Sequence, residues 1–305
     1  MTTTATPTHS TPDAQVPQYN PKSESTGAKR VKSTLFHIVA LALTAVVLYP
    51  ALWMVASSFK PNSEIGGTNT SLWSSNFSMD NFVTAMDGIG GVSTLQFFTN
   101  SLILAVGAVV GTVLSASVSA YAFARIKFPG RSVFFGMMIA TLLLPFHVVI
   151  IPQYIIFNQL GLVDTYVPLL IGKFLAADAF FVFLMVQFMR NLPAELDEAA
   201  RIDGAGHVRI FTSIMLPLMK PALISTSIFS FIWSWNDFLG PLLYLNTPDK
   251  YPLPLALRLF VDQTQSSDYG AMIAMSVLAL LPVLIFFLIF QRYIVEGVST
   301  QGLKG

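Results

Sequence analysis

A short polar stretch between two long apolar segments holds the residues best suited to docking on another protein. Pro193 is followed by Glu195, Asp197 and Glu198, and then by two small residues, Ala199 and Ala200. Proline suits the first turn of a helix, acidic side chains suit its positive amino end, and alanine is the strongest helix former. We therefore predict a short, slim helix whose alanine face enters a groove on a partner, while its acidic residues meet basic ones at the rim.

The residues after this helix complete a longer pattern. Gly204 and Gly206 favour a helix end or bend. The whole string reads Glu198-Ala199-Ala200, three residues, Gly204, nine residues, Ile214, one residue and Leu216-Pro217. This string resembles the signature cytoplasmic loop of ABC importer permeases, the membrane subunits that carry solutes inward on ATP hydrolysed by a partner. The predicted coupling loop spans residues 190–217, with approximate ends.

The resemblance implies a role for each part of the loop. In ABC importers this helix docks in a cleft of the ATP-binding subunit, so that closure of the ATPase dimer rocks the membrane helices. Carried over to this sequence, the core of the dock would be Glu198, Ala199, Ala200 and Gly204, flanked by Arg201, Asp203, Ala205, Gly206 and His207. An ordinary amphipathic loop helix is the alternative interpretation, because an exposed Glu is usually only solvated.

Further motifs are similar to those of maltose-type sugar permeases, from about residue 34 to the end of the chain. They include Tyr121-Ala122-Phe123-Ala124-Arg125, Leu160-Gly161-Leu162-Val163-Asp164-Thr165, Trp235-Asn236-Asp237 and Gln291-Arg292. The resemblance implies the type I ABC importer permease fold. It also implies an assembly with an ABC ATPase dimer, a second homologous permease and an extracytoplasmic solute-binding protein.

Composition independently indicates a membrane protein. Hydrophobic residues make up 53% of the 305 residues, and charged residues only 11%. A soluble domain has about 25% charged residues. Apolar runs long enough to cross a bilayer recur along the chain, and in lipid such segments must be helical. The expected fold class is therefore all-α and polytopic. The chain contains no cysteine, which excludes thiol chemistry, disulfides and cysteine metal sites.

The apolar segments predict the domain organisation. Six transmembrane helices are expected, at about 34–57, 99–124, 133–156, 166–189, 214–239 and 270–291, within a permease domain of 34–305. Residues 1–33 are rich in Thr, Ser, Pro and Gln and are expected to form a disordered tail. Lys and Arg are concentrated in the tail, the second and fourth connections and the carboxyl end, which places both termini in the cytoplasm. Loops 58–98 and 240–269 are then external, with a short helix expected at 80–86.

Charged residues within the predicted spans are candidates for a solute path. Lys173 and Asp178 lie in the fourth span, where a charge costs roughly 2.5–3.5 kcal/mol at the bilayer centre. Five residues apart on a continuous helix, they would lie about 140° apart, so a direct pair is not expected. Trp235, Asn236 and Asp237, late in the fifth span, combine an aromatic face with polar groups that suit a sugar ring. Interface anchoring is the alternative for both groups.

Other function classes lack support in the sequence. The chain has no phosphate-binding G-x-x-x-x-G-K-[ST] loop, so ATP would be bound by the partner ATPase and this chain needs no cofactor. No metal-ligand spacing or catalytic motif is present, and no nucleic-acid partner is indicated. The main hypothesis is a non-enzymatic subunit in a prokaryotic cell membrane that imports a sugar or oligosaccharide. An importer of another solute, such as glycerol phosphate, and an ion-coupled secondary transporter are the alternatives. The latter would need inverted repeats, which the sequence does not show.

Overall fold

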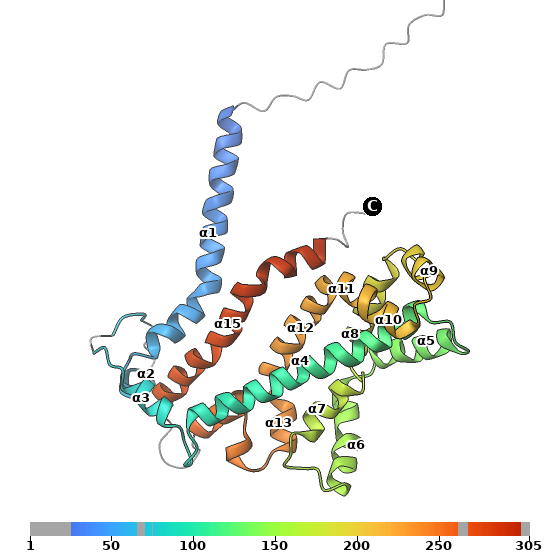
Figure 1. Ribbon diagram of the computed structural model, residues 1–305. Helices are drawn as coiled ribbons and strands as arrows, with labels where there is room; N and C mark the ends of the chain where they lie inside the picture. Colours follow the sequence, from blue (N-terminus) through green and yellow to red (C-terminus); the bar gives the residue numbers. More distant parts are fainter. Residues whose placement is uncertain (1–25, 66–70, 75, 262–267, 300–305) are drawn as a thin grey trace, which may run out of the picture. The chain divides into compact units, whose positions relative to one another are not determined.

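The computed structural model describes residues 26–65, 71–74, 76–261 and 268–299. Over these residues the chain is helical (Figure 1), with the following elements: α1 (Thr26–Ser57), α2 (Asn62–Ile65), α3 (Asp80–Asp87), α4 (Thr94–Arg125), α5 (Arg131–Thr141), α6 (Phe146–Gln159), α7 (Val167–Phe174), α8 (Ala179–Arg190), α9 (Glu195–Ile202), α10 (His207–Ile210), the π-helical turn η1 (Phe211–Met215), α11 (Leu216–Leu218), α12 (Lys220–Trp235), α13 (Leu239–Tyr244), the 3-10 turn η2 (Pro248–Lys250), α14 (Leu253–Ala256), the 3-10 turn η3 (Leu257–Phe260) and α15 (Tyr269–Ser299).

The chain divides into two compact units, residues 1–51 and residues 52–305. Most of α1 belongs to the first unit, and this helix begins at Thr26 rather than near residue 34. Residues 1–25 of the predicted disordered tail lie outside the described residues. The predicted short helix in the first external loop is present as α3.

Helix α4 is the centre of the second unit and packs against α7, α8 and α12. One side of α4 carries a buried stripe of small residues, namely Ser101, Ala105, Ala108, Thr112, Ala116 and Ala120. Small side chains let helix backbones approach closely, which is how helices associate in membranes, where the hydrophobic effect between them is weak. Gly111 lies on this side, directly against the ring of Phe174 from α7.

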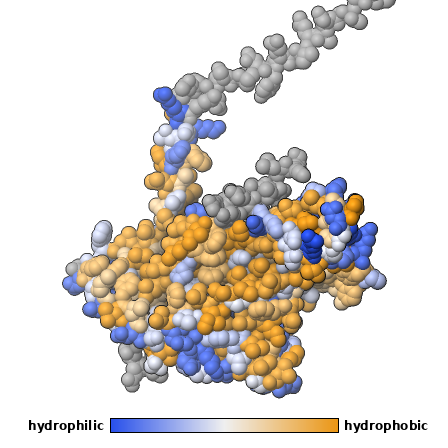
Figure 2. Space-filling view, in the orientation of Figure 1, coloured by the Kyte–Doolittle hydropathy of each residue, from blue (hydrophilic) through white to orange (hydrophobic). Residues whose placement is uncertain are grey.

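Two buried clusters fill the second unit around α4. The first joins Ala120 and Tyr121 of α4 to Met185 and Met189 of α8 and to Ala200 of α9. The second joins the other half of α4 to α12, α14 and α15, with Phe97, Phe231, Trp235, Phe260 and Met275 at its centre. Figure 2 shows a broad band of apolar side chains on the outer surface of these helices, with hydrophilic residues around α9 at one margin.

The predicted count of six spans is not confirmed. Within the described residues, four helices are long and apolar enough to cross a membrane, and a bent pair (207–218 with 220–235, 75° apart) would make a fifth. The predicted third span is not one helix: α5 ends at Thr141, and α6 begins after Pro145 at its N-cap. A proline ring fixes its own backbone and disfavours helical geometry in the preceding residue. The count of six therefore stays a prediction.

The close packing of α4 can be tested at Gly111. A Cβ atom there would lie 2.7 Å from Phe174 Cδ2, whereas a Cβ on Gly136 of α5 would meet nothing within 4 Å. We expect Gly111→Leu to lower the free energy of unfolding by about 1–3 kcal/mol relative to Gly136→Leu, because overpacking forces side chains and backbone to shift. Thermal unfolding in detergent measures the difference. Equal midpoints for the two variants would contradict close packing of α4 on α7.

Candidate functional site

Helix α9 is short and ends at a glycine, as the sequence predicts. Gly204 has a φ of +81°, a conformation that residues with a side chain rarely adopt. The Ala205 amide donates to the Ala200 carbonyl at 2.9 Å, and the Gly204 amide donates to the Arg201 carbonyl at 3.0 Å. These two bonds form a Schellman motif, which satisfies carbonyls that the helix end leaves free. Pro193 precedes the helix instead of lying in its first turn, because the helix begins at Glu195 with Ala194 as its N-cap.

The two faces of α9 have different surroundings. Asp197 and Ala200 are buried against the rest of the chain, and Ala200 belongs to the buried cluster around α4 and α8. The opposite face is exposed and contains Glu198, Ala199, Arg201, Ile202, Asp203 and Gly204. Ala205 is half-buried, and Gly206 and His207 are exposed. The docking set predicted from sequence is therefore divided: Ala200 faces the chain's own core, and most of the others face outward.

Arg125, the last residue of α4, anchors α9. Its Nη2 donates to the carbonyls of Met189 at 2.8 Å and Leu192 at 2.7 Å. Its Nη1 lies 3.4 Å from Asp197 Oδ2, and the two side chains are only 8% and 9% exposed. A planar guanidinium can bind several acceptors at once in a fixed geometry, which a lysine cannot do. One buried side chain thus joins the ends of α4 and α8 to α9.

Two apolar side chains next to this anchor are strongly exposed, and the sequence pattern did not single them out. Ile202 at the end of α9 is 86% exposed, and Val208 in α10 is 77% exposed. Tyr121 of α4 holds the start of α10, because its hydroxyl lies 3.3 Å from Nδ1 of His207. The surface of α9 and α10 therefore offers both charged and apolar contacts on a backbone fixed to α4.

The charged residues of the fourth predicted span form a direct pair, and the expectation that they would not was wrong. Lys173 Nζ lies 2.7 Å from Asp178 Oδ2. The expectation assumed a continuous helix, but α7 ends at Phe174 and α8 begins at Ala179. Ala176 in the gap has a φ of +54°, so the chain turns and brings the two side chains together.

The remaining candidates for a solute path lie in different environments. Trp235 is 2% exposed, and its Nε1 donates to the carbonyl of Ala279 at 3.2 Å, so its ring is part of the core. Asn236 is exposed and donates back to the Ile232 carbonyl of its own helix at 2.8 Å. Asp237 accepts a bond from the Gly240 amide at 3.1 Å and interacts electrostatically with Lys173. Lys173 and Asp178 thus form an ion pair that also interacts electrostatically with Asp237, and Trp235 is not part of it.

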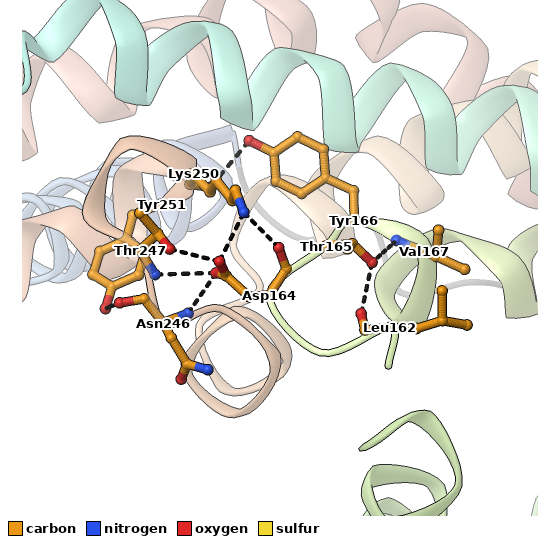
Figure 3. A network of polar contacts seen from close by, with 9 residues as sticks. All are labelled: Leu162, Asp164, Thr165, Tyr166, Val167, Asn246, Thr247, Lys250 and Tyr251. Carbon is orange, nitrogen blue, oxygen red and sulfur yellow. Dashed lines mark hydrogen bonds and ion pairs between the residues drawn. The ribbon is translucent and has the colours of Figure 1, made fainter. Parts of the chain in front are cut away.

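A second polar cluster joins the connection between α6 and α7 to the segment after α13 (Figure 3). The Asp164 carboxylate accepts bonds from Lys250 Nζ at 2.7 Å, the Asn246 amide at 2.9 Å and the Thr247 amide at 3.0 Å. The Asp164 amide donates to the Tyr244 carbonyl at 2.7 Å. The φ of Asp164 is +63°, a left-handed conformation that Asp adopts more readily than most residues with a side chain. Asp164 therefore fixes the start of the predicted loop 240–269.

The bonds to Asp164 also determine its protonation. Loss of water around the carboxylate disfavours the charged form, but the hydrogen bonds from Lys250, Thr247 and the backbone amides outweigh this effect. The pKa of Asp164 therefore lies well below its ordinary value. A carboxyl group with a lowered pKa stabilises the folded state fully above its unfolded pKa of about 3.9. That contribution is lost as the pH falls from there toward the folded pKa.

Comparison with known proteins places this chain among transport proteins, with matches that cover most of its length. Residues 111–300 match the family described as "Binding-protein-dependent transport system inner membrane component". The chain is 34% identical to the arabinooligosaccharides transport system permease protein AraQ of Halalkalibacterium halodurans, over 90% of this chain and 98% of that protein. It is 34% identical to the diacetylchitobiose uptake system permease protein NgcG of Streptomyces coelicolor, with 88% of each chain covered.

Two further similarities extend the comparison. The sn-glycerol-3-phosphate transport system permease protein UgpE of Brucella abortus is 31% identical, over 88% of this chain and 96% of that protein. Among solved structures, a chain of a bacterial ABC transporter involved in the import of the acidic polysaccharide alginate matches with a TM-score of 0.77 and 23% identity. The match covers 90% of this chain and 99% of that one, and it supports the fold.

The anchor of α9 can be tested at Asp197. We expect Asp197→Ala to destabilise the protein by about 3–5 kcal/mol, because Arg125 would be left buried without its charged partner. Asp203→Ala, at the exposed end of the same helix, is the matched control and should stay within about 0.5 kcal/mol of the wild type. Thermal unfolding and proteolysis of the 190–213 segment measure both. Equal behaviour of the two variants would contradict the anchor.

The Asp164 cluster makes a pH-dependent prediction. In Asp164→Asn the charged acceptor is lost, so we expect faster proteolysis of the segment around 244–251 at neutral pH. As the pH falls below about 4, the wild type should progressively approach the variant, because Asp164 in the opened segment then takes up a proton while the folded carboxylate stays ionised, and this favours opening. Asp87→Asn, at the end of α3, serves as the control. A difference between wild type and Asp164→Asn that persists unchanged at the lowest pH would contradict the assignment.

Proposed function

Because this chain belongs to the family of binding-protein-dependent transport system inner membrane components, we propose that α9 is its coupling helix, docking in a cleft of an ATPase subunit. The chain is a multi-pass permease subunit of an ABC importer, not an enzyme. Such a subunit needs a surface through which ATP hydrolysis in a partner subunit moves its membrane helices. In our proposal α9 provides this surface. The observation that carries it is the exposed face of a short helix held rigidly to α4 by Arg125.

The docking surface combines steric access with charge. The face contains Ala199 and Gly204, which leave the backbone accessible, while Glu198 offers an acidic contact to a basic rim. Ile202 and Val208 add exposed apolar area that a partner cleft would cover. Arg201, Asp203 and Gly206 lie on the same surface and flank it. Ala200 contributes from the inner side, because its small side chain lets α9 pack closely on the core.

A sugar or oligosaccharide is the proposed solute. Two relatives that match most of the chain carry arabinooligosaccharide and diacetylchitobiose in their names, which favours a carbohydrate. A relative named for sn-glycerol-3-phosphate keeps a phosphorylated polyol as the second candidate. Within the chain, Lys173, Asp178 and Asp237 are the proposed polar groups of the solute path, with the exposed Asn236 beside them. Charged groups held in a membrane segment usually line a cavity or meet a partner.

The partners follow from the same assembly. We expect an ABC ATPase dimer at α9, a second homologous permease against the exposed apolar helix faces, and an extracytoplasmic solute-binding protein at loops 58–98 and 240–269. We propose that both termini lie in the cytoplasm of a prokaryotic cell, and the excess of Lys and Arg near α9 and in the tail supports this orientation. The Asp164 cluster would then lie outside the cell and hold the second external loop in place for the binding protein.

Docking can be tested with tagged protein purified together with its partner subunits from native membranes. We expect Gly204→Asp and Glu198→Lys to lose the ATPase during purification and to lose solute uptake, because bulk or a reversed charge would enter the contact. Glu195→Lys makes the same charge change at the other end of α9 and is the matched control, which should retain both. The amount of each of the three variants in the membrane reports whether it inserts and folds normally. A variant that is present at the wild-type level but lacks the ATPase has lost docking and not folding.

Two results would contradict the proposal. If Gly204→Asp or Glu198→Lys retains the ATPase and normal uptake, α9 is not the coupling helix. If the wild-type chain is reproducibly isolated alone while transporting its solute on an ion gradient, the ion-coupled alternative is correct instead.

A further inference from the structure

A basic pocket lies where the end of α4, the start of α5 and the end of α8 meet, and none of its lining residues belongs to the proposed docking surface. Its volume is about 370 Å³, and it is lined by Lys127, Phe128, Arg131, Ser132, Phe135 and Arg190. The lining residues come from three places in the chain: the connection after α4, the first turns of α5 and the end of α8. Small-molecule sites in proteins commonly have volumes of about 300–1,000 Å³, so the pocket can hold a headgroup-sized ligand.

Three cationic side chains converge on this pocket without an acidic neighbour among its lining residues. In the described part of the chain, none of Lys127, Arg131 and Arg190 forms a salt bridge. Arg131 donates through Nη1 to the Ile126 carbonyl at 3.4 Å, and Arg190 lies with Cζ 4.7 Å from the centre of the Phe135 ring. These contacts hold the guanidinium groups in place and leave their remaining donors available. Like charges brought together repel unless an anion neutralises them.

The surface next to the pocket is apolar and belongs to the same helix. Val133, Phe134 and Met137 of α5 are 65%, 55% and 60% exposed. A ligand that covers both parts must carry a negative group at one end and hydrocarbon at the other. We propose that this pocket binds the phosphate of an anionic phospholipid, whose acyl chains lie along α5.

Several physical features favour a lipid headgroup. Guanidinium groups match the geometry of phosphate and can bind two of its oxygens at once. Ser132 adds a neutral hydrogen-bond donor at the same place. Basic pockets between membrane helices on the cytoplasmic side are a recurring form of anionic lipid site. The proposal does not depend on the docking role of α9, but it rests on the proposed topology, in which this pocket lies on the cytoplasmic side of the membrane.

The test uses the full chain with its partner subunits in detergent, titrated with phosphatidylglycerol, phosphatidylcholine or inorganic phosphate and followed by native mass spectrometry. We expect tighter retention of phosphatidylglycerol than of phosphatidylcholine. Arg131→Gln and Arg190→Gln should each weaken phosphatidylglycerol binding by about tenfold or more, since each loses charge-assisted hydrogen bonds to the phosphate. Arg209→Gln removes an exposed arginine outside the pocket and should leave binding unchanged.

Other results would overturn the proposal. Equal retention of the two lipids by the wild type, together with arginine-dependent binding of inorganic phosphate, would make free phosphate the ligand. Equal phosphatidylglycerol affinity in Arg131→Gln, Arg190→Gln and Arg209→Gln would place the lipid elsewhere. Loss of the ATPase from Arg190→Gln with unchanged lipid binding would make the pocket a protein contact. Arg131→Lys, which keeps the charge, is expected to bind more tightly than Arg131→Gln and separates charge from folding.

Discussion

The contact on which the arrangement of α9 depends is the buried guanidinium of Arg125. This side chain closes α4 and holds, at once, two carbonyls near the end of α8 and the carboxylate of Asp197 in α9. A buried ion pair adds little net stability when it forms, but it is costly to break because a charge is then left without a partner. Arg125 therefore acts as a constraint on position. A force applied to α9 is transmitted to α4, and α4 is packed against α7, α8 and α12.

The membrane adds a second constraint, which is visible where helices are interrupted. In lipid, an irregular backbone is tolerated only where its polar groups are satisfied by protein or water. At the gap between α7 and α8, Ser115 donates to the Lys173 carbonyl at 2.6 Å, and the Ala177 amide donates to the Gly172 carbonyl at 3.0 Å. The Lys173–Asp178 pair spans the same gap. These contacts satisfy polar groups of the backbone and side chains where the helix is interrupted.

Local patterns in the sequence predicted local structure well. The acidic start of α9, its alanines and its glycine end are contained in a few neighbouring residues, and the Schellman motif at Gly204 follows from glycine's freedom at positive φ. Three of the six predicted apolar segments, 34–57, 99–124 and 270–291, likewise lie within the long helices α1, α4 and α15.

The features that depend on distant parts of the chain could not be predicted in this way. Arg125 and Asp197 are far apart in sequence, so no local spacing connects them. The Lys173–Asp178 pair was missed because the prediction assumed a regular helix. The turn occurs at Ala176, which is neither glycine nor proline, so the sequence does not indicate a break there. Ile202 resembles any apolar helix residue in the sequence, and only the packing of α9 shows that it faces outward.

The central claim is that α4 and α9 move as one body when the partner ATPase closes. The chain contains no cysteine, so spin labels can be placed on cysteines introduced at Val118 in α4 and Glu195 in α9, both of which are exposed. Pulsed electron resonance on the full assembly, with and without ATP, measures the distance between them. The account predicts the same narrow distance distribution in both states. A shift or broadening on ATP binding would contradict it, because α9 would then move independently of the helix to which Arg125 joins it.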